Sequence, residues 1–311
     1  MSIQTVDKVK EKSSIPLYFI CFFTIITIIL IILRIFFQDL SEWIQETKDI
    51  DFKILMEGMN NGLVNFYDPV AISDWPPYYL YFWYFLFFPI YFPIYLNPNN
   101  LIIGVYIWDI LRLVLTIIIV REAPRVFKEK KDLLIFYMLS IVGFSIDGYY
   151  NNVNFLISFF LFYSYVFLEK DKKWIAGILF TLATFKITAL LFLPVLLLVR
   201  KIKWKDLIYY LVPFLLICVP YIIFPNYFSQ MFNNWFYSDK EIHGILIFDS
   251  IMWKALQPSH LMFIGLLLII FLENLTNEDR KNLYRIILVS IIAVYYVYLT
   301  TIVFIIPVVF G

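Results

Sequence analysis

The stretch SIPLYFICFFTIITIILIILRIFF, residues 14–37, is long and apolar enough to cross a bilayer, because about 20 apolar residues span the hydrocarbon core as a helix. It follows three lysines, Lys8, Lys10 and Lys12. However, it is too long for the apolar core of a signal peptide, and no small-residue cleavage site follows it. We therefore expect this stretch to remain in the protein as an anchoring first span.

The rest of the chain has the same apolar character. Hydrophobic residues make up 62% and aromatic residues 21% of the 311 residues, and the mean hydropathy is +0.80. A soluble domain contains only about 45–50% apolar residues, so the composition excludes a water-soluble fold. We expect an all-α polytopic membrane protein that forms one membrane domain over residues 1–311. The net charge of +1 averages separate basic and acidic clusters and therefore says nothing about partners; we expect no nucleic-acid partner.

Five basic clusters determine the predicted topology. Short basic loops tend to stay in the cytoplasm, which places the N-terminus there with Lys8 to Lys12, Arg121 to Lys131, Lys170 to Lys173, Arg200 to Lys205 and Arg280 to Arg285. The first span then exits, the acidic segment Gln38 to Asp74 is external, and only one crossing fits before Arg121; Asn100 to Val120 takes that place. The preceding stretch, Trp75 to Leu96, contains prolines 76, 77, 89 and 93. We expect it to lie on the membrane surface or to re-enter.

The requirement that every basic cluster lies on the cytoplasmic side also sets the predicted topology of the remaining residues. We expect a first span at 14–37, an external loop with juxtamembrane helices at 38–98, a helical core at 99–224, an external loop at 225–258 and C-terminal spans at 259–311. This gives about 9 transmembrane or re-entrant helices. In the core, Asp132 to Gly148 and Asn151 to Leu168 form a hairpin with an external tip. Trp174 to Val199 forms two short helices with Lys186 near their turn.

Two carboxylates lie just beyond the first span. Asp49 and Asp51 are separated by one residue, and in an extended loop both side chains would point to the same face. One member of such a pair can hold a divalent cation, Mg²⁺ or Mn²⁺, while the other acts as a general base. No cofactor is certain from this pattern. The alternative is an acidic loop that only faces water.

Further costly polar residues fall on the same predicted side. They are Lys186 at the turn and, at the hairpin tip, Asp147, Asn151, Asn152 and Asn154. A lysine inside the membrane costs several kcal/mol and by default faces a partner or a water-filled cavity. An anionic phosphate would suit Lys186, and the alternative is a structural pair with Asp147. Asp109 and Arg112 are three residues apart on one helical face, which favours a structural ion pair.

The second external loop brings aromatic and polar side chains together. Its segment Asn233 to Gly244 contains Trp235, Phe236 and Tyr237 beside Lys240 and His243. Aromatic faces and hydrogen bonds commonly bind sugars, and a cation adds phosphate contact. Lys240 and His243 are therefore candidate substrate-binding residues, although a lone histidine such as His243 is more often a surface residue than a catalytic one.

These motifs, in this order, resemble the C-type superfamily of integral-membrane glycosyltransferases. Asp49-Ile50-Asp51-Phe52 is similar to the Asp-x-Asp-Phe/Tyr segment of polyprenol-phosphate-mannose-dependent mannosyltransferases and of the catalytic subunit of glycosylphosphatidylinositol mannosyltransferase I. The other matching segments are Trp75-Pro76-Pro77-Tyr78-Tyr79, Trp108-Asp109-Ile110-Leu111, Asn151-Asn152-Val153-Asn154-Phe155, and Ala176-Gly177 followed by Phe185-Lys186 and Leu193-Pro194. The asparagine segment lacks the Gly-Gln of the superfamily. The resemblance covers roughly residues 10 to 200.

The resemblance implies an inverting hexosyltransferase, with mannose as the expected sugar. The donor would be a polyprenyl or dolichyl phosphate sugar, and the acceptor a glycan or lipid-linked hydroxyl. Transfer would occur on the extracytoplasmic face of a prokaryotic cell membrane, among membrane lipids. A membrane transporter and a non-catalytic subunit of a glycosylation complex are the alternatives, and a partner subunit is compatible with each of these functions.

The resemblance also assigns roles to residues. Asp51 would be the general base, Lys186 would neutralise the departing phosphate, and Asp49 or Asp147 would orient the acceptor or a cation. The remaining candidate substrate-binding residues are Trp75, Asn151, Asn154, Lys240 and His243.

Overall fold

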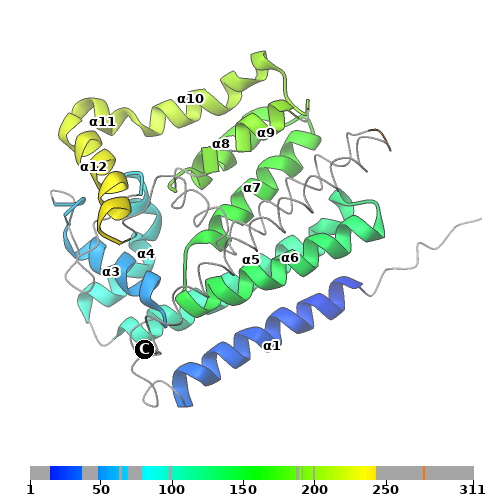
Figure 1. Ribbon diagram of the computed structural model, residues 1–311, viewed down its shortest axis with the longest axis horizontal. Helices are drawn as coiled ribbons and strands as arrows, with labels where there is room; N and C mark the ends of the chain where they lie inside the picture. The colour runs from blue at the N-terminus through cyan, green and yellow to red at the C-terminus, as the bar shows by residue number, and fades with distance from the viewer. Residues whose placement is uncertain are drawn as a thin grey trace, which may run out of the picture. The chain divides into compact units, whose positions relative to one another are not determined.

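In the part of the chain that the structure describes, every regular element is a helix (Figure 1). The computed structural model describes residues 15–36, 48–62, 65–68, 79–97, 100–186, 189–190, 192–198, 200–242 and 276. The chain divides into two compact units, Met1–Leu266 and Leu267–Gly311, and the description below concerns the first. The all-α prediction is confirmed for the described residues.

The first unit contains the following helices, given in chain order. They are α1 (Ile15–Phe36), α3 (Ile50–Asn60), α4 (Trp83–Leu96), α5 (Leu101–Val126), α6 (Lys130–Tyr150), α7 (Asn154–Glu169), α8 (Lys173–Ala183), α9 (Phe192–Leu198), the 3₁₀-helix η3 (Trp204–Leu207), α10 (Ile208–Ile217), α11 (Val219–Ile223) and α12 (Pro225–Ile242).

Three of the described helices, α1, α5 and α6, are long and apolar enough to cross a membrane. Their outer faces carry exposed apolar side chains such as Ile25 and Ile29 of α1 and Ile107 of α5, a surface suited to lipid tails. The protein is therefore a membrane protein. The expected total of about 9 transmembrane or re-entrant helices stays a prediction, and the predicted C-terminal spans at 259–311 lie almost wholly outside the described residues.

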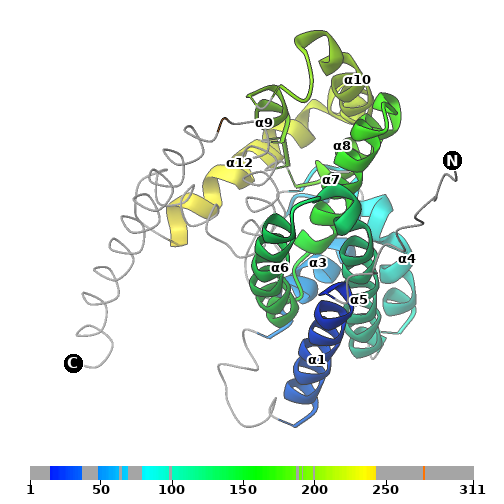
Figure 2. The same cartoon turned by 90° about the vertical axis from the view of Figure 1, so that its right-hand side faces the viewer.

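The helices pack side by side in a defined order. Helix α1 contacts α5 and α6, α7 contacts α5, α6 and α8, and α8 contacts α10 (Figure 1, Figure 2). Gly177 of α8 allows the last of these contacts, because a Cβ atom there would lie 1.8 Å from the Tyr209 carbonyl oxygen of α10. Only a residue without a side chain fits at such a crossing.

The predicted hairpin with its tip near Asp147 to Asn154 is present. Helix α6 ends at Tyr150, and α7 begins at Asn154. Asn151 between them adopts a left-handed conformation with φ 54° and donates its backbone N–H to the Asp147 carbonyl. Asparagine tolerates this conformation better than most residues. The local chemistry of the tip therefore reverses the chain and collects three asparagines at one end of the α6–α7 pair.

The proline-containing stretch forms a helix shorter than a span. Helix α4 has 14 residues and includes Pro89 and Pro93. Trp83, Phe87 and Tyr91 of this helix are buried, whereas Phe85, Phe88 and Phe92 are exposed. At 1.5 Å per residue the helix is about 21 Å long, and its placement on the membrane surface or as a re-entrant element stays a prediction.

The segment after the third basic cluster also follows the prediction of two short helices. Helix α8 ends at Ala183, Thr184 to Lys186 form a turn, and α9 begins at Phe192. Lys186 therefore lies at the turn, as expected.

Candidate active site

The extended-loop prediction required Asp49 and Asp51 to point to the same face. In the structure they do not. Asp49 has a left-handed backbone, with φ 62°, immediately before α3, and its N–H donates to the Tyr149 carbonyl over 3.0 Å. Asp51 lies in the first turn of α3. Residues two apart in a helix do not face each other. The prediction was wrong because the helix begins between the two aspartates and directs them to different partners.

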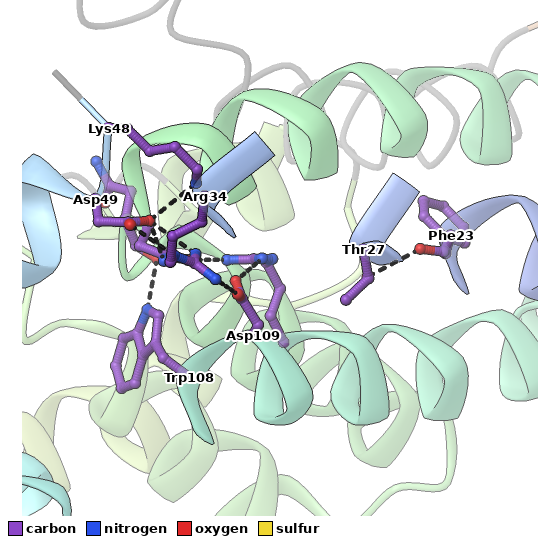
Figure 3. A network of polar contacts seen from close by, with 10 residues as sticks. Phe23, Thr27, Arg34, Lys48, Asp49, Trp108 and Asp109 are labelled. Atoms are coloured by element: carbon purple, nitrogen blue, oxygen red, sulfur yellow. Dashed lines mark hydrogen bonds and ion pairs between the residues drawn. The ribbon is translucent and has the colours of Figure 1, made fainter. Parts of the chain in front are cut away.

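Asp49 lies in a closed network of buried charges (Figure 3). The Arg34 guanidinium donates from Nε to Oδ2 over 2.8 Å and from Nη2 to Oδ1 over 2.9 Å. Lys48 Nζ is 3.1 Å from Oδ1, and Asn151 Nδ2 donates to the same oxygen over 2.7 Å. Both carboxylate oxygens are therefore occupied by donors of the chain itself.

The network continues into α5. Arg34 Nη1 lies 2.7 Å from Asp109 Oδ2, so one arginine bridges two carboxylates (Figure 3). Arg112 pairs with Asp109 and also donates to Asn151 Oδ1. The predicted Asp109–Arg112 ion pair is thus confirmed. Because this network joins α1, α5 and the asparagine tip, it holds the start of α3 in place.

The environment of Asp49 favours its charged form. Burial alone raises the pKa of this carboxyl, but the hydrogen bonds and charges of Arg34 and Lys48 outweigh burial and lower the pKa below its ordinary value. Burial lowers the pKa of Lys48, against the opposing charge of Asp49. Asp49 is therefore an ionised carboxylate already paired with cations.

This pairing makes Asp49 a poor cation ligand. Mg²⁺ and Mn²⁺ need carboxylate or carbonyl oxygens with free lone pairs, and the Asp49 oxygens face Arg34, Lys48 and Asn151 instead. The described residues contain no group of three or more His, Cys, Asp or Glu side chains able to hold a metal. A divalent cation bound at Asp49, which the sequence pattern allowed, does not fit this arrangement.

Asp51 has a different environment. It is partly buried and accepts a hydrogen bond from Asn152 Nδ2 over 2.6 Å. Burial raises the pKa of Asp51 above its ordinary value, and the Lys186 charge and the Asn152 hydrogen bond oppose that rise without cancelling it. A raised carboxyl pKa is what a general base working near neutral pH requires.

Lys186 reaches the other end of the same tip. Its ammonium is buried and donates to Asn154 Oδ1 over 3.0 Å, while Asn154 Nδ2 donates to Asp147 Oδ1 over 3.0 Å. Asn154 therefore links Lys186 to Asp147, and the alternative of a direct structural pair between these two residues stays a prediction. The three-residue tip Asn152 to Asn154 brings Asp51 and Lys186 together.

Aromatic packing supports this arrangement. Trp108 of α5 is fully buried, contacts the ring of Phe52 at 5.5 Å and donates from Nε1 to the Asn152 carbonyl over 3.4 Å. The turn that carries Lys186 is held from the other side, because the Leu80 N–H donates to the Phe185 carbonyl over 2.8 Å. Neighbours of both Asp51 and Lys186 are thus held by hydrogen bonds from other parts of the chain.

Some predicted residues lie outside this description. Trp75 and His243 are outside the described residues, and Lys240 lies in α12 without a described side chain. Helix α12 does reach the first loop, because Asn234 Nδ2 donates to the Tyr67 carbonyl over 2.9 Å.

Arg34, Lys48 and Asn152 contribute to the site but were not among the candidate site residues. One signal could have identified Arg34. In the predicted topology it lies at the external end of the first span, where the positive-inside rule disfavours arginine. A membrane arginine at that end indicates a buried partner.

The family model described as Glycosyltransferase family 87 matches residues 76–306. No curated protein and no solved structure matches the chain.

Proposed function

The chain belongs to glycosyltransferase family 87, and we propose that it transfers a hexose from a polyprenyl or dolichyl phosphate. Mannose is the proposed sugar. The acceptor is a hydroxyl of a glycan or of a lipid-linked molecule on the extracytoplasmic face. One observation carries the proposal. The tip Asn152 to Asn154 holds a carboxylate of raised pKa, Asp51, and a buried ammonium, Lys186, at its two ends.

Asp51 is the general base in this proposal. Its carboxylate removes the proton from the acceptor hydroxyl as that oxygen attacks the anomeric carbon of the donor. Attack occurs opposite the phosphate, so the anomeric configuration is inverted. Asn152 supports Asp51 through its 2.6 Å hydrogen bond. A well-placed general base contributes about 10²–10⁴-fold to a rate.

Lys186 stabilises the leaving group. As the bond between the anomeric carbon and the phosphate oxygen breaks, its electron pair stays on the lipid phosphate. A fixed cation placed where this charge develops lowers the barrier. Asn154 accepts from Lys186 and donates to Asp147, so both residues hold the ammonium in position. Asp49 and Asn151 are positioning residues in this scheme, because their polar groups serve Arg34 and Arg112.

The two other functions considered for this chain receive less support. A transporter would not explain membership of a glycosyltransferase family. A non-catalytic subunit would not need a carboxylate of raised pKa beside a buried lysine.

The Asp51→Asn variant tests the proposal. The full chain is reconstituted in lipid vesicles and supplied with labelled polyprenyl-phosphate mannose and membrane extract as acceptor. We expect the substitution to lower kcat by about 10²–10⁴-fold with little change in KM. Asp68→Asn is the matched control, since Asp68 is an exposed aspartate near the end of the same loop segment. Transfer at the wild-type rate by Asp51→Asn would refute the assignment of the base.

A further inference from the structure

Two tyrosines lie at the end of helix α6. Tyr149 and Tyr150 are its last two residues, and both side chains are half-buried. Helix α6 contacts α3, which carries Asp51, and the charge of Asp51 acts on the Tyr150 hydroxyl. Tyr150 also precedes by two residues Asn152, whose side chain donates to Asp51 over 2.6 Å. Tyr150 therefore lies at the Asp51 end of the hairpin tip, whereas Lys186 lies at the other end.

Contacts with the Asp49 network hold Tyr149 in place. Its carbonyl accepts the Asp49 N–H over 3.0 Å, and the Lys48 ammonium lies 5.7 Å from the centre of its ring. The rings of Tyr149 and Tyr150 meet edge to face, with 5.1 Å between their centres and 87° between their planes. A cation over an aromatic face and an edge-to-face ring pair are both stabilising arrangements. Tyr150 therefore packs on an anchored neighbour.

The Tyr150 hydroxyl is not used to hold the described helices together. Other tyrosine hydroxyls do hold parts of the chain together through hydrogen bonds, namely those of Tyr67, Tyr91, Tyr137 and Tyr221. Among the described residues, none is hydrogen-bonded to the hydroxyl of Tyr150. A half-buried ring with an unused hydroxyl, next to the carboxylate proposed as the base, is available to a substrate.

The chemistry around Tyr150 suits one face of a sugar ring. The C–H groups of a hexose carry a slight positive charge, which the negative face of an aromatic ring attracts. The hydroxyl groups of the same sugar need hydrogen-bond partners, and Asp51 has lone pairs beyond the one that faces Asn152. An aromatic face beside a carboxylate thus meets both the apolar and the polar side of a sugar.

We propose that Tyr150 is an acceptor-binding residue, whose ring stacks on the acceptor sugar and directs the attacking hydroxyl to Asp51. That hydroxyl loses its proton to Asp51 and bonds to the anomeric carbon, while the lipid phosphate leaves with the electron pair. The inference rests on the proposed function, because it takes Asp51 as the base of that reaction. It adds a residue that determines acceptor binding, and it divides the hairpin tip between the donor phosphate at Lys186 and the acceptor at Tyr150.

Photo-crosslinking tests the location without requiring turnover. The full chain in lipid vesicles is irradiated with octyl α-mannoside that carries a diazirine on its sugar, and adducts are mapped by mass spectrometry. We expect adducts in residues 149–152 and in the first turn of α3, competed by unlabelled octyl α-mannoside but not by octyl glycerol, which has hydroxyl groups and no sugar ring. Equal competition by octyl glycerol would show an unspecific amphiphile site and overturn the proposal. Adducts confined to other segments would also overturn it.

Two variants test the stacking role in transfer from polyprenyl-phosphate mannose to octyl α-mannoside. Tyr150→Ala removes the ring, so we expect the KM for the mannoside to rise about tenfold, a loss of about 1.4 kcal/mol, with the KM for the donor nearly unchanged. Tyr150→Phe keeps the ring and should give a smaller rise. A rise in Tyr150→Phe as large as in Tyr150→Ala would overturn stacking, and an equal rise in the donor KM would overturn the assignment to the acceptor.

Tyr163→Ala is the matched control. Tyr163 is also half-buried and has an aromatic neighbour, Phe159, with 4.9 Å between ring centres, but its hydroxyl interacts with Glu122 rather than Asp51. The control should therefore leave both KM values unchanged. If Tyr163→Ala raises the mannoside KM as much as Tyr150→Ala does, the effect comes from lost packing, and the proposal fails.

These experiments separate the two levels of inference. If Asp51→Asn keeps full transfer activity while the adducts include Tyr150, the proposed base fails and the acceptor-binding residue stands. If Asp51→Asn abolishes transfer while the adducts lie elsewhere, the proposed function stands and the assignment of Tyr150 fails.

Discussion

Asp49 and Asp51 are two residues apart, yet they belong to networks of opposite character. Asp49 is buried, accepts from Arg34, Lys48 and Asn151, and has a lowered pKa. Asp51 is partly buried, accepts from Asn152 and has a raised pKa. The first carboxylate has its bonding capacity filled by the protein, whereas the second retains lone pairs that a substrate proton could use.

The comparison indicates that two residues of one short segment have different roles, Asp49 in stability and Asp51 in the proposed reaction. Breaking the Asp49 network should reduce stability, and breaking the Asp51 network should reduce rate. A buried charge network is costly to disrupt because the remaining partner stays charged and unpaired. A reactive carboxylate makes few bonds in the free protein and therefore contributes little to stability. The following predictions test this separation, in order of decreasing effect.

The largest effect on stability is expected from Arg34→Met. This substitution leaves Asp49 and Asp109 without the arginine that bridges them, and should destabilise the protein by about 3–5 kcal/mol. Thermal unfolding in detergent, followed by circular dichroism, measures the change. Arg125→Met is the control, since Arg125 forms an exposed pair with Glu122 worth at most about 1 kcal/mol. Equal Tm values for both variants would contradict the structural role of the Asp49 network.

Two neighbouring asparagines provide the next test. Asn151→Ala removes a donor to Asp49 and an acceptor for Arg112, so we expect a loss of about 1–3 kcal/mol in stability. Asn152→Ala removes the donor to Asp51 and the acceptor of the Val153 N–H; it should lower kcat about tenfold, or about 1.4 kcal/mol in barrier height, with a smaller loss of Tm than Asn151→Ala. Both quantities are measured for both variants. A larger loss of Tm in Asn152→Ala together with a larger loss of kcat in Asn151→Ala would contradict the separation of the two networks.

Gly148→Ala should affect the structural network alone. A Cβ atom at Gly148 would lie 2.3 Å from Leu30 Cδ1 and 3.1 Å from Arg112 Nη2, so the side chains of Leu30 and Arg112 must shift. Overpacking of this kind costs about 1–3 kcal/mol, and we place this variant at the lower end because both neighbouring atoms end flexible side chains. The expected result is a lower Tm with kcat retained. A lost kcat at an unchanged Tm would show that the two networks are not separate.

The smallest expected effect is a displacement of the pH profile. Burial raises the pKa of Asp51, and Lys186 partly opposes this rise. A general base must be deprotonated, so kcat/KM should increase with pH through the pKa of Asp51. Asn152→Ala removes a hydrogen bond that favours the carboxylate, and should move this acidic limb to higher pH. A limb that does not move in Asn152→Ala would exclude Asp51 as the titrating group.

Asp49 and Asp51 should also be protonated at different pH values when the solution is acidified. The pKa of Asp49 is lowered in the folded protein, so its contribution to stability persists until the pH falls through that low value. Asp51, with a raised pKa, is protonated first. Activity should therefore decline at higher pH than stability does, a difference that Tm and rate measurements over one pH series would reveal.

Much of this arrangement was predictable from local sequence. The charge pattern indicated the hairpin between α6 and α7 and the turn at Lys186, both of which the structure contains. It also identified Asp109 and Arg112 as an ion pair. The roles of Asp49 and Asp51 were not separable at that level, because the extended-loop assumption missed the start of α3 at Ile50. The roles assigned to the site residues stay predictions, and the side chains of Trp75, Lys240 and His243 are outside the described part of the structure.

The sequence by itself determined the class of the protein and which polar residues gather near one end of its helices, since apolar length and the placement of charge are properties of consecutive residues. Only the tertiary structure decided which of the two carboxylates has few bonding partners within the protein. Asn151 binds Asp49 from 102 positions along the chain and Asn152 binds Asp51 from 101. Arg34 reaches Asp49 across 15 positions. Partners so far apart meet only through helix packing, and the left-handed backbone at Asp49 sends each aspartate to its own partner.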